Sequence, residues 1–333
     1  MKFNRHKTIY LYITLIALLA IGLIFSITLG SSNIGLSDLL KGLILKDNFK
    51  TESIIVYNLR LPRALGAIIA GMGLAVSGAI LQTVTNNGLA GPNIIGVNAG
   101  AGLGVVLISV LLPFNFYLTP IAAFFGAFLT TILIGAVAVK MNGQKATVIL
   151  AGIAITAILN AFISLFMLLD DNLPISYRYF SIGGLNGVTI EKIILPFFVV
   201  LIAIALSLIF SSKIDALNLN DTTAISIGVN VKLVRFVAIL IASLSAAAAV
   251  SFAGLLGFVG LAVPHIAKKL VGFKTIRLVP ISALIGATLL VYADLLSRII
   301  LPKTEIPLGI ITAFLGAPFF VVLLLRGNKN AWV

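Results

Sequence analysis

The feature that most constrains this chain is the spacing of its charges. Asp, Glu, Lys and Arg are absent from six long stretches, which are residues 8–37, 64–139, 146–169, 193–212, 236–267 and 306–325. A bilayer core about 30 Å thick is crossed by roughly 20 apolar helical residues, so each stretch can hold at least one span. Only 10% of the residues are charged and 60% are hydrophobic, unlike an ordinary soluble domain. The sequence therefore predicts an all-α polytopic membrane protein.

Turn signals divide these stretches into ten predicted spans. The longest stretch is interrupted by NNGLAGPN (86–93) and by PFNFYLTP (113–120), so we expect three spans within it. The first stretch is longer than the core of a signal peptide and lacks a cleavage site, which favours a retained helix. The predicted spans cover residues 9–29, 62–82, 94–112, 118–139, 147–169, 192–211, 234–252, 257–271, 279–297 and 306–325.

The stretch 236–267 is long for one span and short for two, and the positions of the basic residues decide between these. A single span would place the lysines and arginines that flank it on opposite sides of the membrane. Two shortened helices that turn near SFAGLLG (251–257) keep them together on the internal side, as the positive-inside rule requires. Ten spans then place both termini in the cytoplasm. Because the net charge of +13 is concentrated at the ends of spans, we expect lipid, not nucleic acid, to face it.

Two segments are predicted to lie outside the spans of this single transmembrane domain, which covers residues 1–333. Residues 36–59 are amphipathic and external, which is typical of a short helix lying on the membrane surface. Residues 212–233 form the largest polar segment on the internal side and carry a modest helical pattern. This internal segment is the natural place for a soluble partner to dock.

Small residues recur at four-residue spacing in two of the predicted spans. One series starts at Gly71, and the other consists of Gly96, Gly100 and Gly104. Such stripes allow helix backbones to approach closely in lipid, so tight packing is the favoured interpretation. A helix packed in this way can also line a transport pathway, and that alternative stays open.

Pro264 and His265 interrupt an apolar run in the eighth predicted span. Zinc and iron sites need about three or four protein ligands, whereas this chain has two histidines and no cysteine. A metal site is therefore not expected, and His265 is interpreted as a structural or interface residue. Pro264 removes a backbone donor and is expected to kink or shorten its helix. The sequence also contains no P-loop and no nucleophile–base constellation, so it predicts no catalytic residue and no cofactor.

Charged residues near one end of the predicted spans suggest two kinds of site. Asp294 lies within a span, where an ionisable side chain often marks function, but Arg298 is four residues away on the same helix face. We favour an intramembrane ion pair, and a proton-coupling role for Asp294 is the alternative. Arg60 and Arg63 lie at the external end of the second span. They are expected either to anchor the chain at the headgroups or pair with external acids such as Glu52, or to dock an acidic partner.

The sequence resembles the FecCD-type permeases of bacterial ATP-binding-cassette importers, which take up iron–siderophore complexes, haem or cobalamin. The resemblance covers nearly the whole chain and is carried by four ordered blocks. They are RLPRALGAIIAGMGLAVSGAILQ (60–82), GFVGLAVPHIAKKLVG (257–272), LVPISALIGATLLVYADLLSR (278–298) and EIPLGIITAFLGAPFF (305–320). It implies the fold of a type II importer permease in the bacterial plasma membrane.

The same resemblance implies partners and the residues that meet them. A second permease subunit, two cytoplasmic ATPase subunits and an extracytoplasmic solute-binding protein are expected, with ATP hydrolysis on the separate ATPase subunits. Arg60, Arg63 and Arg298 correspond to arginines that face acidic residues of the binding protein in related permeases. The segment 216–231 resembles the one that meets the ATPase, where the expected contact residues are Leu217, Asp221, Ala224, Ile227 and Gly228.

The chain departs from the family pattern after the second span, and two functions stay open. Relatives often read N-P-L-A-D-P, whereas Gly88 and Gly91 replace the proline and the aspartate here. The favoured function is the permease of an iron–siderophore importer, with haem or cobalamin as alternative cargo. The other function is an ion-coupled secondary transporter that uses Asp294.

Overall fold

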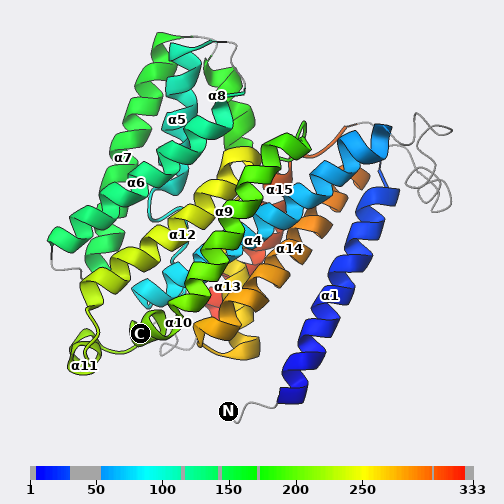
Figure 1. The fold of residues 1–333 in the computed structure, drawn as a ribbon. Coiled ribbons are helices and arrows are strands. Elements are labelled where there is room, and N and C mark those ends of the chain that lie inside the picture. Colours follow the sequence, from blue (N-terminus) through cyan, green and yellow to red (C-terminus); the bar gives the residue numbers. More distant parts are fainter. Residues whose placement is uncertain are drawn as a thin grey trace.

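The computed structural model describes residues 5–30, 54–113, 117–141, 145–170, 173–301 and 304–326, and each regular element in these ranges is a helix (Figure 1). Seven of these helices are long and apolar enough to cross a membrane. They are α1 (Arg5–Thr28), α4 (Leu61–Thr85) with the π-helix η1 (Ile55–Arg60) before it, α6 (Thr119–Lys140), α7 (Lys145–Leu169), α9 (Ile190–Ile209), α12 (Val231–Ala253) and α14 (Thr275–Ile299). This arrangement confirms the predicted all-helical, multi-spanning fold class.

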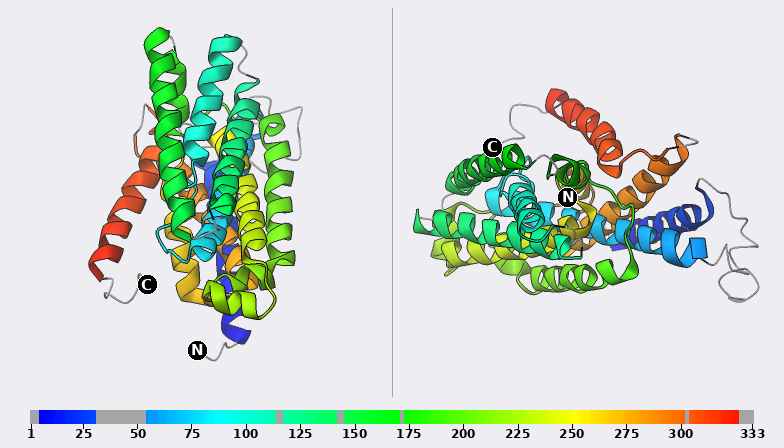
Figure 2. Two further views of the ribbon diagram at one scale, coloured as in Figure 1. Left: turned by 90° about the vertical axis from the view of Figure 1, so that its left-hand side faces the viewer. Right: turned by 90° about the horizontal axis from the view of Figure 1, so that it is seen from above.

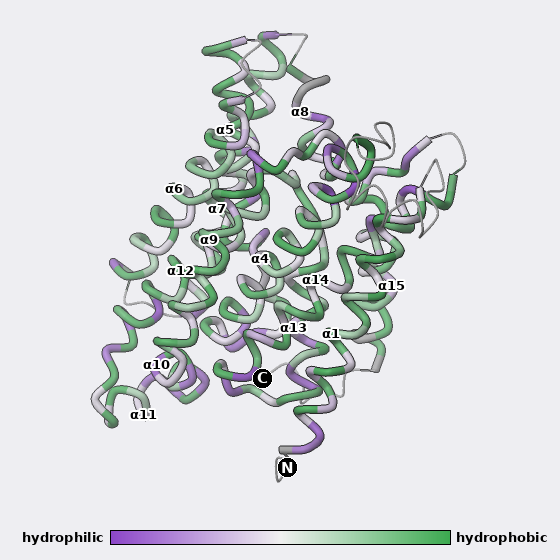
Figure 3. The backbone as a smooth tube through the Cα atoms, turned by 45° about the vertical axis from the view of Figure 1, so that its right-hand side comes forward, coloured by the Kyte–Doolittle hydropathy of each residue, from purple (hydrophilic) through white to green (hydrophobic). Residues whose placement is uncertain are grey.

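Helix α4 forms the centre of the bundle and is the most enclosed of the long helices. It packs against α14, α12, α9 and the shorter α13 (Val259–Val271). Helices α5 (Val97–Leu111), α6 and α7 form a group on one side, and α1 lies at the opposite edge (Figure 1). Helix α15 (Leu308–Arg326) runs along another edge (Figure 2). Hydrophobic residues follow the middle of the helices and hydrophilic residues gather towards their ends, as expected in a bilayer (Figure 3).

A helix lies at each of the ten predicted ranges, although several boundaries move by a few residues. The largest shifts are four residues, in α1, which begins at Arg5 instead of 9, and in α14, which begins at Thr275 instead of 279. Helix α5 begins only at Val97, because Gly96 before it adopts a left-handed conformation with a φ of 70°. A further helix, α8 (Leu173–Ile182), follows α7 and was not predicted. The proposed external segment 36–59 lies mostly outside the described residues, and its last residues enter η1.

The stretch 236–267 forms two helices, as the positions of the basic residues indicated. Helix α12 ends at Ala253 and α13 starts at Val259, with Gly254 and Phe258 in positive-φ conformations at 68° and 64°. The backbone of this turn is covered by neighbouring chain, because Leu255 N donates a hydrogen bond to Phe180 O at 3.1 Å. Irregular backbone at membrane depth requires such partners, since lipid offers none.

Glycines allow the central helices to touch through their backbones. A Cβ on Gly71 of α4 would collide with Gly286 O of α14, and a Cβ on Gly286 would collide with Gly71 O. The same closeness joins α5 to α6, where Gly100 and Gly104 meet the backbone of α6. The glycine stripes noted in the sequence are therefore positions of close helix packing, whereas Gly96 serves at a helix start.

Candidate functional site

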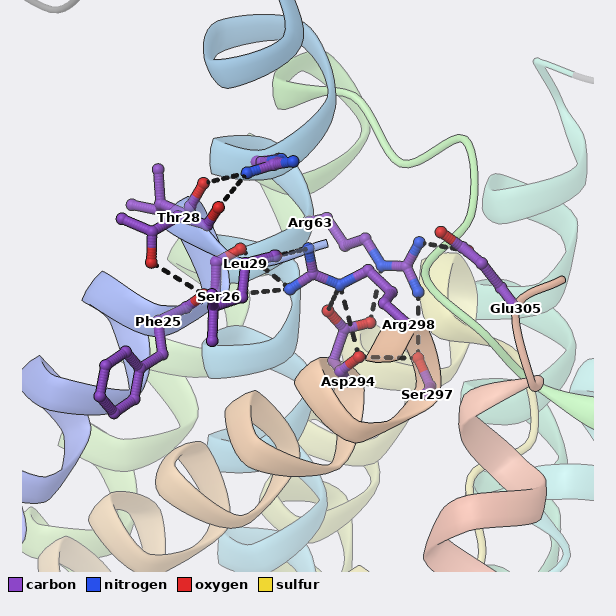
Figure 4. Close-up of polar contacts among 11 residues, drawn as sticks. Phe25, Ser26, Thr28, Leu29, Arg63, Asp294, Ser297, Arg298 and Glu305 are labelled. Carbon is purple, nitrogen blue, oxygen red and sulfur yellow. Dashed lines mark hydrogen bonds and ion pairs between the residues drawn. The ribbon is translucent and has the colours of Figure 1, made fainter. Parts of the chain in front are cut away.

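Charged side chains meet where the ends of α4, α14 and α1 come together (Figure 4). Arg63 on the first turn of α4 donates from Nε to Asp294 Oδ1 at 2.7 Å and from Nη2 to Ser297 Oγ at 3.2 Å. Its Nη1 donates to Glu305 Oε2 at 2.7 Å. We call Arg63, Asp294, Ser297, Arg298 and Glu305 the Asp294 cluster.

The ion pair expected between Asp294 and Arg298 is present, in addition to the pair of Asp294 with Arg63. Arg298 Nε lies 3.2 Å from Asp294 Oδ2, although the angles are those of an ion pair and not of a directed hydrogen bond. Asp294 is fully buried, and Arg298 is only 7% exposed. Arg298 lies on α14, the same helix as Asp294, whereas Arg63 lies on α4. The ion pair of Asp294 with Arg63 therefore joins α14 to α4.

Two arginines also close the last turn of α1. Arg298 Nη2 donates to Ser26 O at 3.0 Å and to Ser26 Oγ at 2.8 Å, and its Nη1 donates to Leu29 O at 3.2 Å. Arg60 Nη1 donates to Ile27 O at 2.6 Å and to Thr28 O at 2.8 Å. The last carbonyls of a helix lack partners within it and carry partial negative charge, so guanidinium groups satisfy them well. Helix α1 is therefore capped by residues of α14 and η1.

A cavity of about 440 Å³ opens beside this cluster. Arg60, Arg63, Arg298 and Glu305 all contribute to its wall. The three arginines nevertheless lie deeper than side chains that project freely into water, since Arg60 is 6% exposed and the Arg63 side chain 12%. The sequence predicted that these arginines lie at one end of the molecule. In the structure all three also donate hydrogen bonds to other residues of the same chain.

A second polar region lies at the opposite end of α14, around the short helices α10 (Ser211–Ala216) and α11 (Asp221–Ser226). Asp215 Oδ1 accepts hydrogen bonds from Thr275 N at 2.8 Å and from Thr275 Oγ1 at 2.6 Å, at the first turn of α14. Asp221 Oδ1 lies 2.9 Å from Arg235 Nη2 on α12. Two carboxylates thus fasten this segment to two long helices. We call this end of the bundle the α10–α11 end.

The residues expected to meet an ATPase divide into buried and exposed sets. Leu217 and Ala224 are buried and anchor the segment, while Asp221 pairs with Arg235. Ile227 is 61% exposed, and Gly228 has a φ of 83° with open space around it. Leu219 and Ile225, which sequence reasoning did not single out, are also exposed. Together with Ile227 they present apolar side chains on a polar end of the bundle.

Pro264 and His265 lie within α13, apart from both charged regions. Pro264 is buried, and the His265 ring meets Phe319 of α15 edge-on, with ring centroids 6.4 Å apart. The described residues include no group of three or more His, Asp or Glu side chains placed to hold a metal ion. His265 thus lies at a contact between α13 and α15.

Sequence reasoning missed Glu305, Asp215 and Ser26 as members of these sites. Glu305 lies in the connection before α15 and Asp215 in the six-residue helix α10, so neither belongs to a long helix whose pattern could be read from the sequence. Ser26 contributes a carbonyl and a hydroxyl to Arg298 from a helix 272 residues away in sequence. The sequence contained one signal for Glu305. This acid follows shortly after Arg298, and it falls on the same predicted external side as Arg60 and Arg63.

A bundle of helices long and apolar enough to span a bilayer, with polar sites at both ends, defines an integral membrane protein. The sequence profile of the FecCD transport family matches residues 18–326, and the chain belongs to this family. It is 38% identical to the Fe(3+)-citrate import system permease protein YfmD of Bacillus subtilis, over 98% of both chains. It is 37% identical to the vitamin B12 import system permease protein BtuC of Vibrio cholerae, over 84% of this chain and 85% of the relative.

A solved structure described as an inward-facing conformation of a metal-chelate type ABC transporter has the same fold. It superposes with a TM-score of 0.83 at 28% identity, covering 96% of this chain and 99% of the other. The protein is thus a multi-pass plasma-membrane permease subunit of an ABC importer. Relatives of this kind are transport subunits, not enzymes, and the family implies an ATPase partner, a substrate-binding partner and dimerisation.

Proposed function

We propose that this chain carries an iron–siderophore complex inward as one of two permease subunits, with both of its termini in the cytoplasm. The observation that carries this proposal is the 38% identity to an Fe(3+)-citrate import permease over 98% of both chains. Haem and cobalamin are the alternative cargoes, because a vitamin B12 permease is related at 37% identity.

In this proposal the α10–α11 end receives the ATPase subunit. Leu219, Ile225 and Ile227 offer an exposed apolar surface there, and Asp215 and Asp221 tie it to α14 and α12. Movement imposed on this segment would therefore reach the long helices directly. ATP hydrolysis takes place on the separate ATPase subunits, and this chain couples it to transport.

The opposite end receives the solute-binding protein at the cavity lined by Arg60, Arg63 and Arg298. Arginines at the rim favour an acidic partner, since complementary charges guide encounter and fix orientation. Because these side chains are also engaged within the chain, docking has to compete with those internal contacts.

The secondary-transporter alternative has less support from the surroundings of Asp294. A coupling carboxylate must gain and lose a proton during transport. Asp294 instead lies within ion-pair distance of Arg63 and Arg298, at 2.7 and 3.2 Å, which favours a structural ion-pair role.

The function is tested by deleting the gene and measuring growth under iron limitation. We expect growth to fail on one or more of a panel of ferric siderophores, ferric citrate and haem, and to return when the intact gene is supplied. Uptake in energised cells should stop when ATP is depleted and continue when a protonophore is added with ATP held constant. Uptake that follows the proton gradient instead would contradict the importer assignment.

A further inference from the structure

Arg63 is held on two sides that differ in how easily another molecule reaches them. Its Nε and Nη2 donate to Asp294 and Ser297, and both acceptor residues are fully buried. Its Nη1 donates to Glu305 Oε2 on the cavity side, where the Glu305 side chain is 35% exposed. The inner partners fix the guanidinium group, and the outer partner can be exchanged without opening the bundle.

The charges of the Asp294 cluster cancel while Glu305 is in place. Arg63 and Arg298 carry two positive charges, and Asp294 and Glu305 carry two negative charges. Without Glu305 the same group would present one net positive charge to the cavity, and Arg60 would add to it. A carboxylate that approaches from outside therefore meets a site whose attraction is weakened by a carboxylate already bound there.

We propose that Glu305 is an internal competitor for the acidic side chain of the docking protein at Arg63. The inference rests on the docking role proposed above and adds its regulation. The partner is a soluble protein with an exposed glutamate or aspartate, and its carboxylate takes the Nη1 that Glu305 occupies. Exposed ion pairs of this kind are weak, so the exchange requires little energy.

The exchange has a consequence for the start of α15. Glu305 lies three residues before Leu308, in the segment that joins α14 to α15. This segment is also held by Ile306 N donating to Ser297 O at 2.9 Å and by Gly309 N donating to Gly183 O at 3.2 Å. Displacing Glu305 removes its charged contact with α4 and leaves these backbone hydrogen bonds in place. Docking would thus loosen the first turn of α15 without detaching it.

The test measures how tightly a dye-labelled hexaglutamate peptide binds the full chain in phosphatidylcholine nanodiscs, by fluorescence anisotropy at low salt. We expect Glu305→Gln to bind the peptide about threefold or more tightly than the wild-type chain, because a competing charge is gone. The gain should disappear as salt rises towards about 1 M, where the screening length is about 3 Å. Labelled hexaglutamine serves as the uncharged control peptide.

Glu191→Gln is the matched control variant. Glu191 is exposed on the first turn of α9, two residues after Thr189 in the cavity wall, but it does not itself line the cavity. This variant removes the same charge from the same end of the bundle without touching Arg63. We expect its affinity for hexaglutamate to stay within about twofold of the wild-type value.

Three results would overturn the proposal. If Glu305→Gln and Glu191→Gln gained the same affinity for hexaglutamate, the gain would be a general effect of removing a negative charge and not evidence of competition at Arg63. If the wild-type chain bound the peptide and Glu305→Gln bound it no more tightly, Glu305 would not be a competitor. The docking role proposed for the arginines would be unaffected. Absence of hexaglutamate binding in every variant would remove the docking role as well, so the two failures are distinguishable.

Discussion

Helix α14 is held by a carboxylate at each end, and the two carboxylates differ in burial and in what they hold. Asp215 is half-buried and accepts hydrogen bonds from Thr275 N and Oγ1 at the start of the helix. Asp294, near the other end, is fully buried and lies between the guanidinium groups of Arg63 and Arg298. The first satisfies a helix terminus, whereas the second forms ion pairs with two cations.

This difference separates the roles of the two ends. Losing a helix-capping side chain costs about 0.5–2 kcal/mol, because water can replace part of what is lost. Removing one partner of a buried ion pair costs roughly 3–5 kcal/mol, because the remaining charge has no solvent. We therefore expect the Asp294 cluster to govern stability and the α10–α11 end to govern assembly with a partner.

The largest effect is expected for Asp294→Asn, which leaves Arg63 and Arg298 without their shared buried anion. The free energy of unfolding should fall by roughly 3–5 kcal/mol, measured by thermal or denaturant unfolding in detergent. Glu305→Gln is the control, because it removes an acid from the same cluster at a more exposed position. A fall of 1 kcal/mol or less in Asp294→Asn would show that the two ends do not differ as described.

A smaller fall in the free energy of unfolding, about 0.5–2 kcal/mol, is expected for Asp215→Ala. The substitution removes the acceptor for Thr275 N and Oγ1, so the first turn of α14 loses its cap. Hydrogen exchange should increase at residues 275–278 and stay unchanged around Asp294. Thr275→Val, alone and combined with Asp215→Ala, completes a double-mutant cycle. Thr275→Val keeps the backbone donor, so additive effects would show that the hydrogen bond from Thr275 Oγ1 to Asp215 contributes no coupling. An unchanged free energy of unfolding in Asp215→Ala would contradict the comparison at this end.

The smallest effect on stability is expected for the double variant Ile225→Ser with Ile227→Ser. Both side chains are more than half exposed, at 62% and 61%, so the free energy of unfolding should change by about 0.5 kcal/mol or less. Transport and stimulation of the ATPase subunit should nevertheless fall strongly, because the docking surface is lost. Thr223→Ala on the same helix is the control. Normal ATPase stimulation in the double variant would place the docking surface elsewhere.

The sequence alone was sufficient to locate the helices whose positions depend on local composition. Uncharged stretches located the ten helical ranges, and the positions of Lys232, Arg235, Lys268 and Lys269 resolved 236–267 into α12 and α13. Helix α8 was missed because its ten residues include Arg178 and several polar groups, and it is too short to span a bilayer.

The contacts of the sites could be predicted only in part. The pair of Asp294 and Arg298 follows from helical spacing, so the sequence alone indicated it. Arg63 reaches Asp294 across 231 residues, and this contact depends on α4 and α14 packing through Gly71 and Gly286. A single sequence does not contain that pairing of helices. The cap that Asp215 provides is likewise a contact between distant segments, with donor and acceptor 60 positions apart in the sequence.

The closure of α1 by Arg298 also sets an order of events during biosynthesis. Ser26 is made early, and the arginine that caps its carbonyl follows 272 residues later. At about 5–20 residues per second, roughly 15–55 s pass between the two. During that interval the first helix resides in the lipid with its last turn unclosed by Arg298. The contacts of Arg298 with α1 form only when the nascent chain is nearly finished, whereas Arg60 becomes available to Ile27 O and Thr28 O much earlier. A chain truncated before α14 would therefore carry a first helix that Arg298 never caps.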